Sequence, residues 1–145
     1  MVLHCLCDGR WNSRHAAPGT RHGELMTWLT HLPHQIPFRA ASTGRRIDDK
    51  TIEGTFLCTA NDELPTTVMV TEAMAQLAGG LVFEKAHGFL TGIDECVIER
   101  PIQPGDLVTL SVKLEADFGG TYRFSGRGSI GGLECVRGRF YLAKS

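Results

Sequence analysis

The sequence lacks several features that would assign it to a broad class of protein at once. None of its apolar runs approaches the ~18 residues that a membrane-spanning helix needs. The opening apolar stretch is short and is soon broken by Asp8 and Arg10, so it does not resemble a signal peptide. Charge of one sign is not in excess, since 15 Lys+Arg oppose 16 Asp+Glu. A general nucleic-acid binder needs a basic excess. We therefore expect neither a membrane span nor a nucleic-acid partner.

A metal-binding pattern is also missing. The chain has five cysteines, and Cys5 and Cys7 are close together, but no second Cys/His pair with finger or ribbon spacing follows them. We expect no metal. Without a secretion signal, the cysteines are expected to be reduced and the protein to be cytoplasmic.

The length of 145 residues suits one domain with a single core, and 42% hydrophobic and 21% charged residues are ordinary globular values. Residues 1–24 show neither helical nor strand periodicity, which predicts an irregular or disordered tail. Residues 25–145 are predicted to form the domain.

One long helix is predicted over residues 67–86, because apolar side chains cover nearly its whole circumference. Such a helix is buried. Pro65, followed by the hydroxyls of Thr66 and Thr67, is a plausible capped start, and Gly88 a stop. Several alanines and glycines within the helix would let a sheet wrap closely around it.

The remaining segments favour strands, because apolar and polar residues alternate and Gly-Gly pairs separate the last of them. The predicted strands are 52–58, 90–100, 108–115, 122–130 and 133–142. The fold class expected from this order is α+β, with one helix against one face of a curved antiparallel sheet.

Glu72 and Gln76 are the polar residues that stand out on the predicted helix. They lie four residues apart and so share one face. A carboxylate on a buried helix is costly unless it is paired, hydrogen-bonded or functional. Glu72 is therefore either a general acid/base or a satisfied structural carboxylate, and the periodicity leaves both open.

Four sequence blocks then occur in order: Leu-Pro-His-Gln-Ile-Pro-Phe at 32–38, Thr-Glu-Ala-Met-Ala-Gln at 71–76, Gly-Ile-Asp-Glu at 92–95, and Arg-Pro-Ile-Gln-Pro-Gly-Asp at 100–106. Together they resemble the β-hydroxyacyl-acyl-carrier-protein dehydratases of the FabZ/FabA type, over roughly residues 26–145. The resemblance implies the hotdog fold, a long helix wrapped by an antiparallel sheet. It also implies a dimer, or a higher oligomer of dimers, with active sites at the subunit interface.

In that family a histidine near a strand end removes the α-proton, and a helix glutamate of the other subunit handles the departing hydroxyl. Glu72 matches the glutamate, while Cys58, fourteen residues earlier, occupies the histidine position. A thiol is a weaker base than imidazole at neutral pH but a good nucleophile. Cys58 is thus either catalytic or a small buried residue at a strand end. His34, between two prolines, is a weaker candidate.

The resemblance further implies no resident cofactor and a substrate carried on the phosphopantetheine of acyl carrier protein or coenzyme A. The family glycine whose amide holds the thioester carbonyl falls at Thr66 or Thr67. Gln76 and Arg100 complete the implied substrate contacts, with Arg100 near the tunnel mouth. Residues 122–145 carry five cations against one acid. They are expected either to dock the acidic carrier or to form an ordinary solvated face.

Three functions remain open. The first is a (3R)-hydroxyacyl-thioester dehydratase of fatty-acid or polyketide-type metabolism, with Glu72 as acid/base. The second is a hotdog thioesterase that uses Glu72 alone on an acyl-carrier or coenzyme A thioester. The third is a non-catalytic subunit, which would pair with a paralogue in a mixed dimer rather than act as a homodimer.

Overall fold

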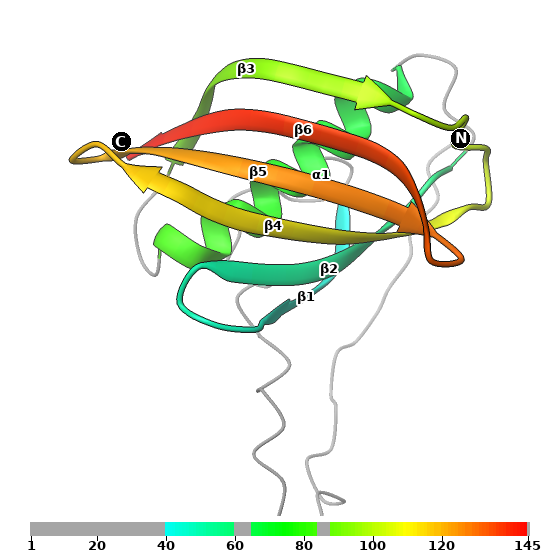
Figure 1. The fold of residues 1–145 in the computed structure, drawn as a ribbon, viewed down its shortest axis with the longest axis horizontal. Helices are drawn as coiled ribbons and strands as arrows, with labels where there is room; N and C mark the ends of the chain where they lie inside the picture. The colour runs from blue at the N-terminus through cyan, green and yellow to red at the C-terminus, as the bar shows by residue number, and fades with distance from the viewer. Residues whose placement is uncertain (1–39, 60–64, 84–87, 145) are drawn as a thin grey trace, which may run out of the picture.

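The computed structural model describes residues 40–59, 65–83 and 88–144. They form one helix and six strands (Figure 1). The elements are β1 (Ala41–Arg46), β2 (Thr51–Leu57), α1 (Thr66–Val82), β3 (Gly88–Ile98), β4 (Leu107–Asp117), β5 (Thr121–Ile130) and β6 (Leu133–Lys144). The predicted tail at 1–24 and the block at 32–38, with His34, lie outside the described residues.

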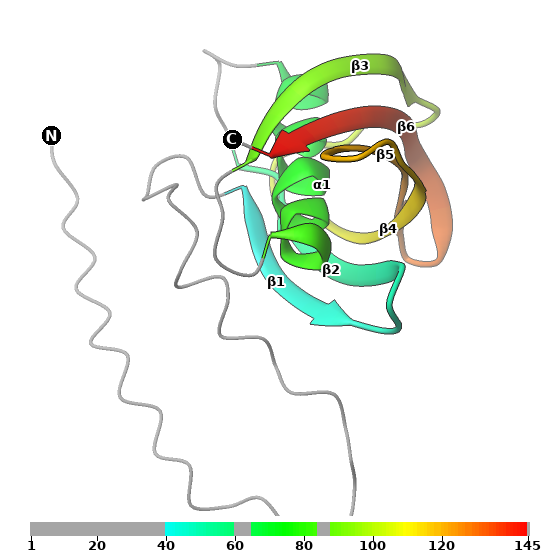
Figure 2. The ribbon, with the colours of Figure 1, turned by 90° about the vertical axis from the view of Figure 1, so that its left-hand side faces the viewer.

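The six strands make a single sheet in the order β1-β2-β4-β5-β6-β3, and each neighbouring pair is antiparallel. Since β2 precedes the helix and β3 follows it, the chain passes through α1 from the strand beside one edge of the sheet to the strand at the opposite edge. Figure 2 shows the sheet curving around α1, which lies against its concave face. The predicted α+β class and the helix wrapped by a curved antiparallel sheet are confirmed.

Alternation along the strands explains why one face of the sheet meets the helix. In β2 and β4 every second residue is buried, and the buried set is Ile52, Gly54, Phe56, Val108, Leu110 and Val112. Successive side chains of a strand point to opposite faces, so this pattern directs one row of residues at α1 and the other at solvent. The apolar row and the helix form the core.

A glycine allows the helix to lie close to the sheet. A Cβ on Gly54 would collide with the backbone oxygen of Thr43 and would lie 2.6 Å from Cδ2 of Leu77 on α1. The absent side chain is what leaves room for Leu77, which is completely buried. The turns at Gly119-Gly120 and residues 131–132 also need glycine, because all four residues have positive φ, between 58° and 112°.

The ends of the helix differ from the prediction. The helix runs from Thr66 to Val82, and no side chain caps its first turn. The predicted threonine cap is wrong because Pro65 is the capping residue, which leaves both threonines inside the helix. The Pro65 carbonyl accepts hydrogen bonds from the amides of Val68, at 2.9 Å, and Met69, at 3.2 Å. In the described ranges no helix is long and apolar enough to cross a membrane.

Candidate active site

Glu72 lies on the second turn of α1 and is half-buried. One turn further on, the side-chain amide of Gln76 donates a hydrogen bond from Nε2 to Oε1 of Glu72 at 2.9 Å. Only 4% of Gln76 is exposed. The prediction that these two residues share a face of the helix is confirmed, and the carboxylate is hydrogen-bonded.

The orientation of the Gln76 side-chain amide is fixed by the hydrogen bonds that its oxygen accepts. Its Oε1 accepts hydrogen bonds from the backbone amides of Ala40, at 3.0 Å, and Ala41, at 3.1 Å. A backbone N–H can only donate, so the oxygen of the side chain must face these residues and the nitrogen must face Glu72. The start of β1 therefore positions the carboxylate through Gln76. The resemblance implied only a substrate contact for Gln76, and the sequence analysis did not predict that this residue positions Glu72.

Cys58 follows directly after β2 and is 5% exposed. Its backbone is held on both sides by the turn before β4: its N–H donates to the Asp106 carbonyl at 2.9 Å, and its carbonyl accepts from Gly105 N at 2.7 Å. The Asp106 carboxylate closes that turn by accepting from Gln103 N at 2.7 Å. The sequence block at 100–106 thus fixes the strand end where the resemblance places the base.

Cys58 Sγ lies 4.0 Å from the carbonyl oxygen of Thr59. The resemblance draws the helix carboxylate and the residue at position 58 from different subunits, and the structure contains one chain. The pairing of Cys58 with Glu72 therefore stays a prediction.

Thr66 and Thr67 form the first turn of α1, where Thr66 is half-buried and Thr67 exposed. The first amides of an α-helix have no partner within the helix, and the dipole makes this end positive. A carbonyl oxygen that gains negative charge would be stabilised there. The geometry suits the predicted binding of a thioester carbonyl, although that role stays a prediction.

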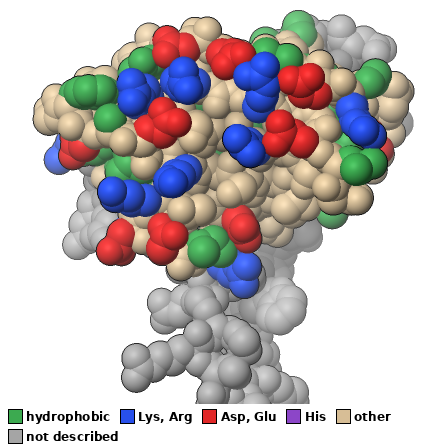
Figure 3. All heavy atoms as spheres, viewed as in Figure 1, with side chains coloured by type: hydrophobic (Ala, Val, Ile, Leu, Met, Phe, Trp, Pro, Cys, Tyr) green, Lys and Arg blue, Asp and Glu red, His purple; other side chains and the backbone are tan. Residues whose placement is uncertain are grey.

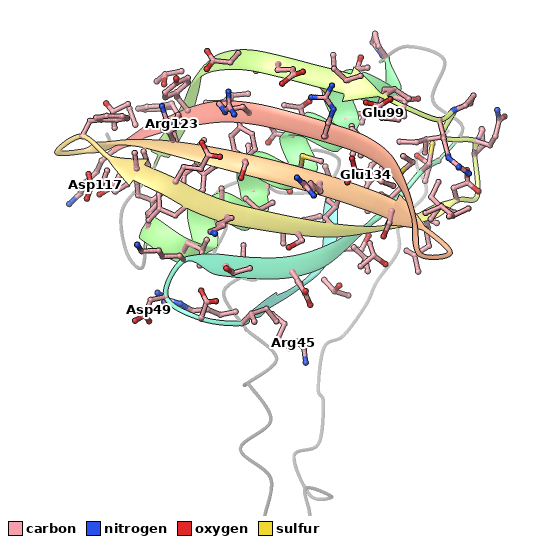
Figure 4. All side chains as sticks on the ribbon, viewed as in Figure 1. Arg45, Asp49, Glu99, Asp117, Arg123 and Glu134 are labelled. Atoms are coloured by element: carbon pink, nitrogen blue, oxygen red, sulfur yellow. The ribbon has the colours of Figure 1, made fainter. Side chains whose placement is uncertain are left out.

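The arginines of the β5–β6 hairpin are matched by carboxylates. Glu115 on β4 pairs with Arg123 at 3.1 Å and with Arg139 at 3.4 Å, and Glu134 lies 3.8 Å from Arg127. Figure 3 shows positive and negative side chains interspersed over this face, and Figure 4 labels Arg123 and Glu134 on it. The hairpin is a surface of mixed charge, which favours the solvated-face interpretation over the carrier-docking one.

Arg100 differs from the hairpin arginines. It follows β3, it is exposed, and its backbone N–H donates to the carbonyl of Cys135 at 3.2 Å. The ion pairs of the described residues leave its guanidinium without a carboxylate partner. The described ranges contain no cluster of three or more His, Cys, Asp or Glu side chains suited to a metal ion.

Comparison with known structures places this architecture among hotdog proteins. The dehydratase heterocomplex ApeI:P from Xenorhabdus doucetiae matches with a TM-score of 0.68 at 20% identity, over 79% of this chain and 88% of that one. Cj0977, a sigma28-regulated virulence protein from Campylobacter jejuni, matches with a TM-score of 0.64 at 17% identity, over 81% and 84%. At these identities the likeness shows the fold alone. The predicted hotdog fold is confirmed.

Sequence comparison gives a closer relationship. The 3-hydroxyacyl-[acyl-carrier-protein] dehydratase FabZ of Paracidovorax citrulli is 34% identical over 122 residues, which cover 71% of this chain and 84% of the relative. FabZ of Acidovorax sp. strain JS42 is similar to the same extent, with 34% identity over 122 residues. No family model matches the chain. The identity and coverage of these relatives, together with the fold, show that the chain belongs to the FabZ family of 3-hydroxyacyl-[acyl-carrier-protein] dehydratases.

Proposed function

We propose that this protein catalyses the reversible dehydration of 3-hydroxyacyl thioesters, with Glu72 as the group that protonates the departing hydroxyl. The observation that carries the proposal is the hydrogen bond between Gln76 and Glu72, because Gln76 is itself fixed by two backbone amides. This support holds the carboxylate in a defined place on the helix, as a positioned general acid requires. The FabZ relatives agree with the reaction class.

The reaction removes one proton from the α-carbon and breaks the bond between the β-carbon and the hydroxyl oxygen. Glu72 delivers its proton to that oxygen, so that water leaves and a trans-2-enoyl thioester remains. The amides at Thr66 and Thr67 hold the thioester oxygen and stabilise the negative charge that develops there. The base that accepts the α-proton stands at the end of β2. In this chain it would be the thiolate form of Cys58, which becomes the thiol when it takes the proton. The reverse reaction adds water to the enoyl thioester.

The proposed assembly is a homodimer formed along β3. This strand is an edge of the sheet and has 11 residues, and Phe89, Leu90 and Ile93 expose large apolar side chains on it. An edge with unpaired backbone groups and apolar side chains favours pairing with another strand. The acyl group would arrive in the cytoplasm on a phosphopantetheine arm, from acyl carrier protein or coenzyme A. Arg100 would then bind its phosphate or a carboxylate of the carrier.

A mixed dimer is the second candidate, and the identity of residue 58 favours it. A paralogue with histidine at this position would supply a stronger base at neutral pH than the Cys58 thiol, while this chain supplies Glu72. The similar ApeI:P structure is a dehydratase heterocomplex, so the fold accommodates unlike subunits in that case. In this arrangement Cys58 is a small buried residue and takes no part in the reaction.

The test is a spectrophotometric assay of the purified protein with a short trans-2-enoyl thioester, which follows enoyl absorbance and thiol release separately. The variants are Glu72→Gln, Cys58→Ala and Cys58→His, with Glu53→Gln as a matched control, because Glu53 lies on β2 and its carboxylate pairs with Arg45 at 3.3 Å. We expect loss of enoyl absorbance without thiol release in the wild type and in Glu53→Gln. Glu72→Gln should abolish it, and general acid–base groups typically contribute roughly 10²–10⁴-fold.

The variants at position 58 separate the two candidates. If Cys58 is the base, Cys58→Ala loses activity and Cys58→His retains or raises it. If the homodimer is inactive and Cys58→His alone gains activity, the mixed dimer is supported. Thiol release that depends on Glu72 would instead show a thioesterase. Activity that survives in Glu72→Gln would refute the proposed role of the carboxylate.

A further inference from the structure

Two polar side chains are buried among the described residues, and both belong to the part of α1 that carries Glu72. They are Thr71, 5% exposed, and Gln76, 4% exposed. Gln76 reaches the start of β1, whereas Thr71 reaches Cys96 on β3. Since β1 and β3 are the two opposite edges of the sheet, the turn with Glu72 is held from both sides.

The hydroxyl of Thr71 makes two contacts of different kinds. Its Oγ1 lies 2.7 Å from the carbonyl oxygen of Thr67 and 3.2 Å from Sγ of Cys96. A hydroxyl has one proton and a carbonyl can only accept, so the short contact uses that proton. For the 3.2 Å contact to be a hydrogen bond as well, the Cys96 thiol must donate to Oγ1. The hydroxyl therefore links the helix backbone to β3 through one atom.

Cys96 lies in a part of β3 that is bound to β6 by backbone pairing and by ion pairs. Glu95, next to Cys96 on β3, and Glu99, directly after the end of β3, both bind Arg137 of β6, at 2.6 Å and 3.0 Å. Arg137 donates these hydrogen bonds, and the one to Glu99, followed by the one to Glu95, raises the pKa of its guanidinium. Cys96 itself is paired with Gly138 of β6. Figure 4 labels Glu99 near the end of β3. The strand is thus fastened to the sheet where Cys96 meets the helix.

From this arrangement we infer that Thr71 and Cys96 are positioning residues for Glu72. Their contact sets the rotation of the helix turn on the side of β3, as Gln76 does on the side of β1. The catalytic meaning of the inference rests on the proposed function of Glu72. A displacement of this turn by an ångström would move the carboxylate out of reach of the substrate hydroxyl, and misplacements of that size cost up to about 10²-fold in rate.

The experiment compares four variants with the wild type. Thr71→Val removes the hydroxyl at nearly constant volume, Thr71→Ser keeps it, and Cys96→Ala removes the thiol. Thr55→Val is the control, since its hydroxyl is 2.7 Å from that of Thr43 on the exposed face of the sheet. Two quantities are measured on each full-length protein: the NMR signals of the Gln76 side-chain amide, and kcat and KM for an enoyl thioester.

We expect the Gln76 amide signals to shift in Thr71→Val and Cys96→Ala, because the turn carrying Glu72 moves relative to Gln76. They should stay at the wild-type position in Thr71→Ser and Thr55→Val. In the active enzyme, kcat should fall roughly tenfold in the first two variants, with KM within about twofold, as expected when orientation rather than binding is lost. A purely structural contact would lower the unfolding temperature and leave kcat unchanged.

Wild-type Gln76 signals in both folded Thr71→Val and folded Cys96→Ala would overturn the inference, whatever the reaction is. If one of these variants does not fold, the other still decides. A wild-type protein without activity on enoyl thioesters would refute catalysis by this chain alone, while shifted Gln76 signals would still support the positioning contact. The two failures are therefore distinguishable.

Discussion

Replacing Gln76 with leucine is the sharpest test of how the fold holds the candidate site. Leucine keeps the size of the side chain and fills the same buried position. It removes the hydrogen bond to Glu72 at 2.9 Å and the acceptor for the amides of Ala40 and Ala41. Both alanines are buried, with 6% and 0% exposed, so water does not readily replace the lost acceptor.

The magnitude follows from those two amides. A buried donor left without a partner costs about 1–3 kcal/mol, so the pair costs about 2–6 kcal/mol. The leucine side chain offsets about 1–2 kcal/mol by being less polar than the amide it replaces. With the middle of both ranges, the free energy of unfolding should fall by about 2.5 kcal/mol, which for a chain of this length lowers the midpoint of thermal unfolding by roughly 7–10 °C.

The assay is thermal and urea unfolding followed by circular dichroism, with Gln103→Leu as the matched control. Gln103 is exposed and uses its backbone N–H, not its side chain, to bind Asp106. Its replacement should change stability by less than about 0.5 kcal/mol. Hydrogen exchange of the Ala40 and Ala41 amides should accelerate in Gln76→Leu alone. Equal stability of the two variants, with unchanged exchange at these alanines, would refute the role assigned to Gln76.

Other regions give independent tests. Gly54→Ala should destabilise the protein by about 1–3 kcal/mol because its Cβ meets the backbone of Thr43, whereas Gly92→Ala, with its nearest contact at 3.7 Å, should be tolerated in the same unfolding assay. Burial raises the pKa of the Cys135 thiol above 9.0, so the unfolded chain releases the proton first and stability should decline as pH rises past 9.0. Urea titrations on either side of that pH should show the decline, and Cys135→Ala should lack it. Ile93→Glu, on the exposed edge of β3, should convert the proposed dimer into folded monomers in sedimentation velocity; a persistent dimer would contradict this interface.

Local sequence patterns were sufficient to predict most of the fold. Alternation identified the strand that contains Val108, Leu110 and Val112, and the Gly-Gly pairs identified two turns that need positive φ. The pairing of Glu72 with Gln76 follows from helical spacing alone. These features depend on residues a few positions apart, which is why a single sequence reveals them.

The features that the sequence did not predict are contacts between residues far apart in the chain and the identity of the residue that caps α1. The contact of Thr71 with Cys96 joins residues 25 positions apart, and the amides that orient Gln76 lie 35 and 36 positions away. Neither leaves a periodic signal. At the helix start Pro65 has a ψ of 139°, outside the helical range, so it is the capping residue and both threonines lie inside the helix.

The hydrogen bonds that hold the candidate site agree with the family resemblance more closely than the side chains that would react. Glu72 keeps its hydrogen-bonded partner, and the turn at Gly105 and Asp106 still holds the strand end at position 58. The departures are the side chain of Cys58, which is buried where the resemblance expects an imidazole, and the threonine, Thr66 or Thr67, that stands at the position of the family glycine. Because the hydrogen bonds around Glu72 and position 58 remain, a substitution at position 58 tests the identity of the base directly. Cys58→His changes the proton acceptor, but the imidazole is larger than the thiol that it replaces at a position only 5% exposed. Its activity therefore reports on the base when the variant keeps the circular dichroism and unfolding midpoint of the wild type.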